Sequence, residues 1–266
     1  MHVVRNGHRI YYDLVGAADA PVIAFSHSLA ADGGMWAEQV PAFLAAGYRV
    51  LRIDLRGHGG SDVFPGNYSM RLLAGDVVQV LDSLEIAKAD FCGLSIGGAI
   101  GQELALRHSD RVGRLVLCDT QPASFKDALQ RWGGRIEAII AANSMEPIAD
   151  ATLGRWLSAE FKARHPVRWR QVRGMVTATT LQGYIGCAAA LQNFNFLAEL
   201  QNIAMPVLVI CGENDPGANP DDSKLIASRV QQGVYREIPK AGHLPNIEQA
   251  ELFNGIVLDW LAKAKG

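Results

Sequence analysis

The chain has 266 residues, of which 49% are hydrophobic and 20% are charged, and its net charge is −2. This composition is typical of one large α/β domain with a substantial core, and it gives no sign of binding to nucleic acid or to an anionic membrane. We recognise neither a signal peptide at the N-terminus nor an apolar run long enough to span a membrane.

Strands and helices are predicted to alternate along most of the chain. The Asn6-Gly7 dipeptide predicts a hairpin, so the chain is expected to open with two antiparallel strands. Continuous apolar runs predict buried strands, and apolar residues at helical spacing predict the helices between them. The expected strands cover residues 8–15, 21–26, 48–54, 114–119, 206–211 and 234–238, and the expected helices lie around 36–46, 221–231 and 246–263, with a further helix that Ser69 caps. Repeated strand–helix–strand units imply a mostly parallel sheet with helices on both faces.

The alternation pauses between residues 122 and 200, where no strand-like run occurs. We interpret this stretch as several helices, broken at Gly133-Gly134, Pro147 and Pro166. The sequence therefore predicts a core domain made of residues 1–121 and 201–266, with residues 122–200 inserted as a helical cap.

The four cysteines, Cys92, Cys118, Cys187 and Cys211, are interpreted as small core residues, because three of them lie in apolar runs and none forms a C-x-x-C pair. No metal or redox site is predicted from them. Their use is typical of a reducing compartment, so we expect a cytoplasmic protein.

Residues 90–100 read as an apolar strand that ends in a sharp turn, with a helix running on to about Arg107. Ser95 lies in this turn between Gly93 and Gly97, which gives the pattern G-x-S-x-G. So tight a turn leaves no room for side chains beside the serine, and it places the serine at a helix N-terminus, where backbone N–H groups favour negative charge. The pattern predicts a nucleophile. On its own, it is also compatible with a glycine-rich turn that only packs closely.

A serine hydroxyl needs a neighbouring base, and the base needs an acid that orients it. His243 follows the last predicted strand and is the candidate base. Asp215, after the preceding strand, and Asp119, one strand earlier, both fit the order Ser…Asp…His. We favour Asp215, since its loop comes directly before the last strand–helix unit, with Glu213 as the alternative within the same turn. The predicted catalytic residues are therefore Ser95, Asp215 and His243.

An acyl-transfer site also needs donors for the oxyanion. The N–H of Ile96, just after the serine, is one candidate, and the N–H of Leu29, in the loop after the strand at 21–26, is the other. His58 lies in a glycine-rich loop and is expected to hold the shape of that loop rather than to do chemistry.

Taken together, these motifs resemble the α/β-hydrolase family over nearly the whole chain. The resemblance lies in residues 27–29, 54–61, 93–98, 212–215 and 241–243. The family usually has His-Gly at the first of these motifs, whereas this chain has Ser28 in place of the glycine, and we expect its hydroxyl to line the site. Within the family the sequence looks most like the 3-oxoadipate enol-lactonases, in residues 93–98, in Trp132, Arg135 and Ile136, and in residues 238–246.

The resemblance implies a serine hydrolase that needs no metal or organic cofactor. It would open a small, carboxylate-bearing enol-lactone through an acyl-enzyme, in bacterial breakdown of aromatic compounds by the β-ketoadipate pathway. A general carboxylesterase or perhydrolase, or a carbon–carbon bond hydrolase with the same triad, remains the alternative. A non-enzymatic receptor on this scaffold is disfavoured, because Ser95, Asp215 and His243 are all present.

Charge in the inserted segment bears on the substrate independently of the resemblance. Residues 122–200 hold nine Lys and Arg against six Asp and Glu, a net charge of +3. A positive cap favours an anionic substrate, although an ordinary solvated helix surface also fits the count. Trp132, beside two glycines, is predicted to form a pocket wall. The sequence gives no indication of an oligomeric state.

Overall fold

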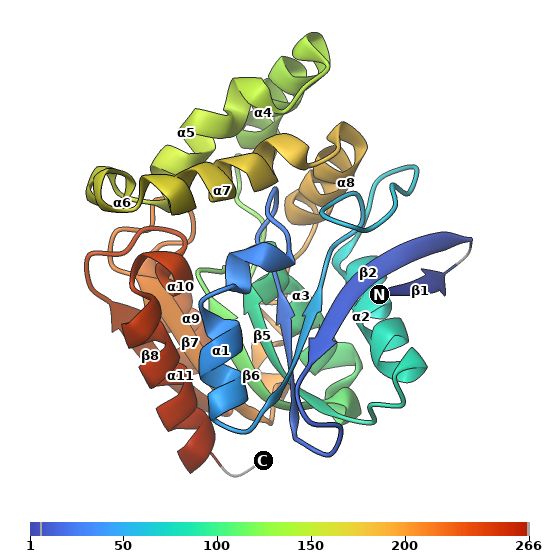
Figure 1. Ribbon diagram of the computed structural model, residues 1–266, viewed down its shortest axis with the longest axis vertical. Helices are drawn as coiled ribbons and strands as arrows, with labels where there is room; N and C mark the ends of the chain where they lie inside the picture. The colour runs from blue at the N-terminus through green and yellow to red at the C-terminus, as the bar shows by residue number, and fades with distance from the viewer. Residues whose placement is uncertain (6, 265–266) are drawn as a thin grey trace.

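The computed structural model describes residues 1–5 and 7–264. The chain forms an eight-stranded sheet with the strand order β1-β2-β4-β3-β5-β6-β7-β8 (Figure 1). Strands β3 to β8 pair in parallel, while β2 pairs antiparallel with both β1 and β4. The strands are β1 (His2–Arg5), β2 (His8–Val15), β3 (Val22–Ser26), β4 (Arg49–Ile53), β5 (Ala89–Leu94), β6 (Val112–Cys118), β7 (Pro206–Gly212) and β8 (Gln232–Ile238). The mostly parallel α/β architecture predicted from the sequence is confirmed.

The sheet order reverses direction at β3, which pairs with β4 on one side and β5 on the other. In open parallel sheets such a reversal opens a crevice at the carboxyl ends of the two strands, where ligands bind. β5 is buried along its whole length, as expected of a strand with helices on both faces. The loops that follow β3 and β5 therefore meet at the middle of one sheet edge.

Helices cover both faces of the sheet. In Figure 1, α1 and α11 lie in front of it and α3 lies behind it. The helices that flank the sheet are α1 (Gln39–Ala45), α2 (Met70–Ser83), α3 (Ile96–Arg107), α9 (Pro220–Arg229), α10 (Pro245–Glu248) and α11 (Ala250–Lys263), and short 3-10 turns occupy Gly33–Trp36, Ser109–Arg111 and Leu200–Asn202. Ser69 caps α2 as predicted, because its side chain accepts a hydrogen bond from the N–H of Leu72. Within the described residues no helix is both long and apolar enough to cross a membrane.

A layer of helices lies beyond the carboxyl ends of the strands, at the top of Figure 1. These helices are α4 (Ala128–Ala142), α5 (Glu146–Trp156), α6 (Ala159–Arg164), α7 (Pro166–Ala178) and α8 (Leu181–Gln192). The chain enters and leaves the layer side by side, since Ser124 donates its N–H to the carbonyl of Phe194 and Phe196 donates its N–H to the carbonyl of Pro122, both at 2.8 Å. These two hydrogen bonds tie both ends of the helical segment to one place above the sheet.

Two helix boundaries differ from the prediction. The Gly133-Gly134 pair does not break a helix, because α4 runs through both glycines. A glycine costs a helix only about 1 kcal/mol, and the amphipathic packing of α4 outweighs that cost. The single helix expected at 246–263 is two helices, since Gln249, with a φ of −130° and a ψ of 50°, is not helical and separates α10 from α11. Asn6 of the predicted hairpin turn lies outside the described residues, although β1 and β2 do pair antiparallel.

In the turn between β5 and α3, the backbone packs too closely against itself and against β3 to leave room for side chains. A Cβ atom at Gly93 would lie 2.1 Å from the carbonyl oxygen of Gly97, and one at Gly97 would lie 2.3 Å from the carbonyl oxygen of Ser26. Only glycine allows the turn to pack this tightly against β3.

We expect Gly97→Ala to lower the free energy of unfolding by about 3 kcal/mol or more, because the new methyl group collides with backbone that cannot move away. The matched control is Gly134→Ala in α4, where nothing lies within 4 Å of the added Cβ. There the same change should stabilise the protein by up to about 1 kcal/mol. Urea unfolding of both variants measures the difference, and equal effects would contradict this account of the turn.

Candidate active site

Ser95 occupies a strained backbone position between β5 and α3. Its φ is 58° and its ψ is −115°, values that a non-glycine residue adopts only when its surroundings impose them. Two hydrogen bonds from the end of β6 hold it there. The N–H of Ser95 donates to the carbonyl of Cys118 at 2.9 Å, and the hydroxyl of Thr120 donates to the carbonyl of Ser95 at 2.8 Å. The turn thus holds Ser95, half-buried, at the end of β5.

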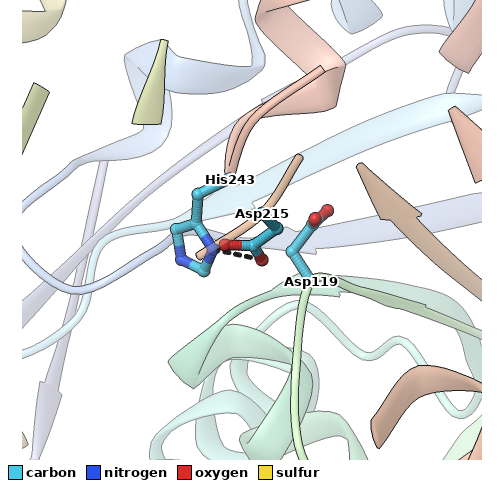
Figure 2. Close-up of side chains that lie close together, drawn as sticks. All are labelled: Asp119, Asp215 and His243. Carbon is cyan, nitrogen blue, oxygen red and sulfur yellow. Dashed lines mark hydrogen bonds and ion pairs between the residues drawn. The ribbon is translucent and has the colours of Figure 1, made fainter. Parts of the chain in front are cut away.

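His243 and Asp215 form a buried hydrogen-bonded pair (Figure 2). Nδ1 of His243 lies 2.7 Å from Oδ2 of Asp215. Asp215 also accepts the N–H of Gly217 at 2.7 Å and that of Ala218 at 3.2 Å, so its carboxylate is fixed in orientation. A carboxylate accepts only, which places the imidazole proton on Nδ1 and leaves Nε2 as a base.

Asp119 lies beside this pair, at the end of β6 (Figure 2). Asp119, Asp215 and His243 each offer one atom that could ligate a metal ion, and these three atoms lie within 4.8 Å of one another. Such a set could in principle hold a cation, but backbone N–H groups and the His243–Asp215 hydrogen bond already use most of its atoms. The arrangement therefore favours proton chemistry. Of the two acids weighed from the sequence, Asp215 is the one that bonds to His243.

Two buried histidines hold the loop that follows β3. Nε2 of His58 accepts the N–H of Ala30 at 3.1 Å, so the ring proton is on Nδ1, which faces the carbonyl of Arg56 at 2.9 Å. His27 is arranged in the same way: its Nε2 accepts the N–H of Leu55, and its Nδ1 faces the carbonyl of Ser28. Burial, followed by the neighbouring His27, lowers the pKa of His58 to about 3. A neutral imidazole at His58 therefore supports this loop, in agreement with the structural role expected for that residue.

The predicted oxyanion donors lie at the ends of adjacent strands. Ile96 is the first residue of α3, so its N–H has no acceptor within the helix. Leu29 lies between two residues whose N–H groups have partners, Ser28 with Sδ of Met35 at 3.3 Å and Ala30 with His58. Leu29 and Ser28 line the same cavity as Ser95, whereas the side chain of Ile96 is fully buried.

This cavity has a volume of about 160 Å³ and lies between the sheet edge and the helical layer. Ser95 and His243 line it, and so does Trp132 from α4. Trp132 packs edge to face with Tyr184 of α8, with 6.1 Å between the ring centroids. The cavity has room for a small molecule.

Two arginines to which the sequence had given no role in the site also line the cavity: Arg135 of α4 and Arg155 of α5. Within residues 1–5 and 7–264, neither lies within ion-pair distance of a carboxylate, and Arg155 makes a hydrogen bond only with the hydroxyl of Thr152, at 3.1 Å. Burial, followed by the positive charge of Arg135, lowers the pKa of Arg155. Arg135 follows Trp132 by one helical turn, and this spacing was the available signal.

The chain belongs to the α/β-hydrolase family, whose model matches residues 23–256, and it is a hydrolase. Two 3-oxoadipate enol-lactonases of Acinetobacter baylyi are 33% and 34% identical to it over 246 and 249 residues, which cover 92% and 94% of this chain and 90% and 91% of those proteins. The solved structure of the enol-lactonase from Burkholderia xenovorans LB400 is 37% identical, with a TM-score of 0.94 over 98% of this chain and 100% of that chain. The family resemblance seen in the sequence is confirmed.

The buried neutral His58 predicts a pH dependence of stability. In the unfolded chain its imidazole takes up a proton below a pKa of about 6.5, whereas in the folded protein it stays neutral down to about 3. The unfolded state therefore binds more protons in this window, and stability should fall by up to about 1.4 kcal/mol per pH unit as the pH drops from 6.5 toward 3. His58→Gln should remove the contribution of this one proton, so that stability falls less steeply as the pH drops. Urea unfolding from pH 7 to pH 4.5 measures the slope. His165→Gln, at an exposed position, is the control and should keep the wild-type slope.

Proposed function

We propose that this hydrolase opens a small enol-lactone that carries a carboxylate, such as 3-oxoadipate enol-lactone, with Ser95, His243 and Asp215 as its catalytic triad. The observation that carries the proposal is the presence of Arg135 and Arg155, without acidic partners, in the cavity that Ser95 and His243 also line. The names of the enol-lactonase relatives support the same substrate class. A general esterase would have no use for two such arginines.

The electrostatics of the two arginines favours an anionic ligand. The two guanidinium groups repel each other, and the charge of Arg135 adds to the cost of keeping Arg155 charged in a partly buried place. Both also act through their charge on the phenol of Tyr184, whose pKa burial raises. A carboxylate between them would relieve the repulsion and accept charge-assisted hydrogen bonds. We therefore propose Arg135 and Arg155 as the site of the substrate carboxylate, with Trp132 as a wall beside it.

We propose the following reaction at this site. His243, oriented by Asp215, takes the proton of Ser95 as the serine oxygen attacks the lactone carbonyl. The N–H groups of Leu29 and Ile96 hold the oxyanion. Cleavage of the ring C–O bond expels an enolate oxygen, which is a better leaving group than an alkoxide. The proton that His243 took from Ser95 passes to the enolate, which gives the ketone and returns His243 to its neutral form. The ketone remains part of the acyl chain on Ser95. A water molecule that His243 activates then releases the acid and restores the serine, so no cofactor is required.

The surrounding segments have roles in the same proposal. Residues 122–200 would act as a cap domain on the core of residues 1–121 and 201–266, since that segment supplies Trp132, Arg135 and Arg155. We propose that the enzyme works in the bacterial cytoplasm, where it catalyses one step in the breakdown of aromatic compounds. The four cysteines are free and buried, which suits a reducing compartment.

Ser95→Ala should lower kcat on the enol-lactone by on the order of 10⁵ or more, because no other group forms the acyl-enzyme. Asp215→Asn should lower kcat by on the order of 10⁴, because an amide partner permits the wrong tautomer of His243. Steady-state kinetics, together with an acyl-enzyme burst on an activated aryl ester, measures both. Wild-type turnover in Ser95→Ala would rule out Ser95 as the nucleophile.

Arg155→Gln and Arg135→Gln should each lower kcat/KM for the carboxylate-bearing lactone by about 10- to 100-fold, mostly through KM, because each removes charge-assisted hydrogen bonds to the substrate. Hydrolysis of the neutral ester phenyl acetate should change by less than about threefold. The matched control is Arg131→Gln. Arg131 lines the same cavity but pairs with Asp127 at 2.8 Å and lies over the Phe125 ring. Equal losses on both substrates would favour a general esterase or perhydrolase.

A further inference from the structure

We propose that Asp119 is a positioning residue that works as a neutral carboxylic acid, sharing its proton with Asp215 and so holding that carboxylate toward His243. This inference rests on the proposed function, because it takes Asp215 to be the catalytic acid. It assigns a role to the carboxyl that the catalytic steps leave unused.

The two carboxyl oxygens of Asp119 have different surroundings. Oδ1 accepts the N–H of Gly212 at 2.8 Å, whereas Oδ2 is fully buried and no N–H or O–H group of the described residues reaches it. A buried carboxylate oxygen without a donor is costly, but a protonated one next to an acceptor is not. The carboxylate of Asp215 is the neighbouring acceptor: one oxygen of each acid lies within 4.8 Å of the other, and a hydrogen bond between the two side chains is among the causes that raise the pKa of Asp119. A proton on Oδ2 would therefore satisfy both carboxyls at once.

The charges around Asp119 point the same way. Asp119 is completely buried, and the part of the chain that the structure describes contains no Lys or Arg in an ion pair with it. Burial, followed by the negative charge of Asp215, raises the pKa of Asp119 well above its ordinary value. Two adjacent carboxylates without a cation do not both ionise. Asp215, with two backbone N–H donors and His243, is the better-stabilised anion of the two.

Other titratable groups face Asp119 from the neighbouring strands. They are the thiols of Cys118 in β6 and Cys211 in β7, the phenol of Tyr235 in β8, and the imidazole of His243. Burial raises the pKa of both thiols and of the phenol, so these three groups are neutral at neutral pH. His243 is the one of these four groups that takes part in the proposed reaction.

The backbone fixes Asp119 in this role. It has a φ of 44°. Two hydrogen bonds tie it to β7: its N–H donates to the carbonyl of Ile210 at 2.9 Å, and its Oδ1 accepts the N–H of Gly212. Its neighbours Cys118 and Thr120 make the two hydrogen bonds that hold Ser95. One three-residue segment thus connects the nucleophile and the acid. A strained backbone held this way at a side chain outside the reaction steps is consistent with a positioning function.

The test compares Asp119→Ala with Asp119→Asn, whose amide can both accept from Gly212 and donate to Asp215. We expect Asp119→Ala to lower kcat more than about tenfold with KM nearly unchanged, and Asp119→Asn to recover most of that loss. In an Asp215→Asn background, Asp119→Ala should lower kcat by less than about a further threefold, because the carboxylate that Asp119 positions is already absent. A purely structural role would give the same loss in both backgrounds.

The pH profile and an infrared spectrum test the proton itself. If Asp119 is neutral in the wild type, Asp119→Asn leaves the acid limb of kcat/KM in place. If it is ionised, removing its charge beside His243 moves that limb to lower pH by about one unit or more, and the proposal fails. The wild-type spectrum at pH 7 should contain a protonated-carboxyl band that Asp119→Asn lacks, and its absence would also overturn the proposal.

The infrared band does not depend on activity, so it still reports on Asp119 if an alanine variant fails to fold or if Asp215 is not the acid. Wild-type kinetics in Ser95→Ala and Asp215→Asn would refute the proposed function instead. The two failures are therefore distinguishable.

Discussion

The backbone strain at Ser95 is the constraint on which the rest of the site depends. A non-glycine residue with a φ of 58° costs about 1–3 kcal/mol, and the chain keeps it only because three strands hold the turn. β5 supplies the turn, β6 supplies the hydrogen bonds of Cys118 and Thr120, and β3 lies so close that Gly97 can carry no side chain. The site is thus a product of sheet packing rather than of any one loop.

Sheet order explains why residues far apart in sequence meet at this turn. β5 lies between β3 and β6, and β7 and β8 follow in order, so the loop after each strand reaches the same edge. The loop after β3 carries Leu29, and the ends of β6, β7 and β8 carry Asp119, Asp215 and His243. Parallel pairing makes such convergence automatic, because all carboxyl ends lie on one side. The helical layer then closes the cavity with residues that the sheet does not supply.

Local patterns in the sequence predicted the fold and much of the candidate site, and long-range geometry set the limit. The turn at Ser95 and the late His243 follow from glycine spacing and chain order, which are local features. Chain order alone does not separate Asp215 from Asp119, since each follows a strand, and the sheet order decides which one faces His243. The break at Gln249 had no local signal, and the roles of Arg135 and Arg155 depend on how helices pack. The catalytic roles themselves remain predictions.

Charge is distributed around the cavity in a way that suits an anionic substrate. Two buried groups at or near its lining are kept neutral: Asp119, which lines the cavity, has its pKa raised, and His58, which holds the loop after β3, has its pKa lowered to about 3. In the proposed reaction, the two arginines oppose the imidazolium that His243 must form, and the ionised Asp215, 2.7 Å from the ring, favours it. A substrate carboxylate bound at the arginines offsets part of the opposing field. Binding of the correct substrate would therefore ease protonation of His243, which gives the positive pocket a part in the chemistry as well as in recognition.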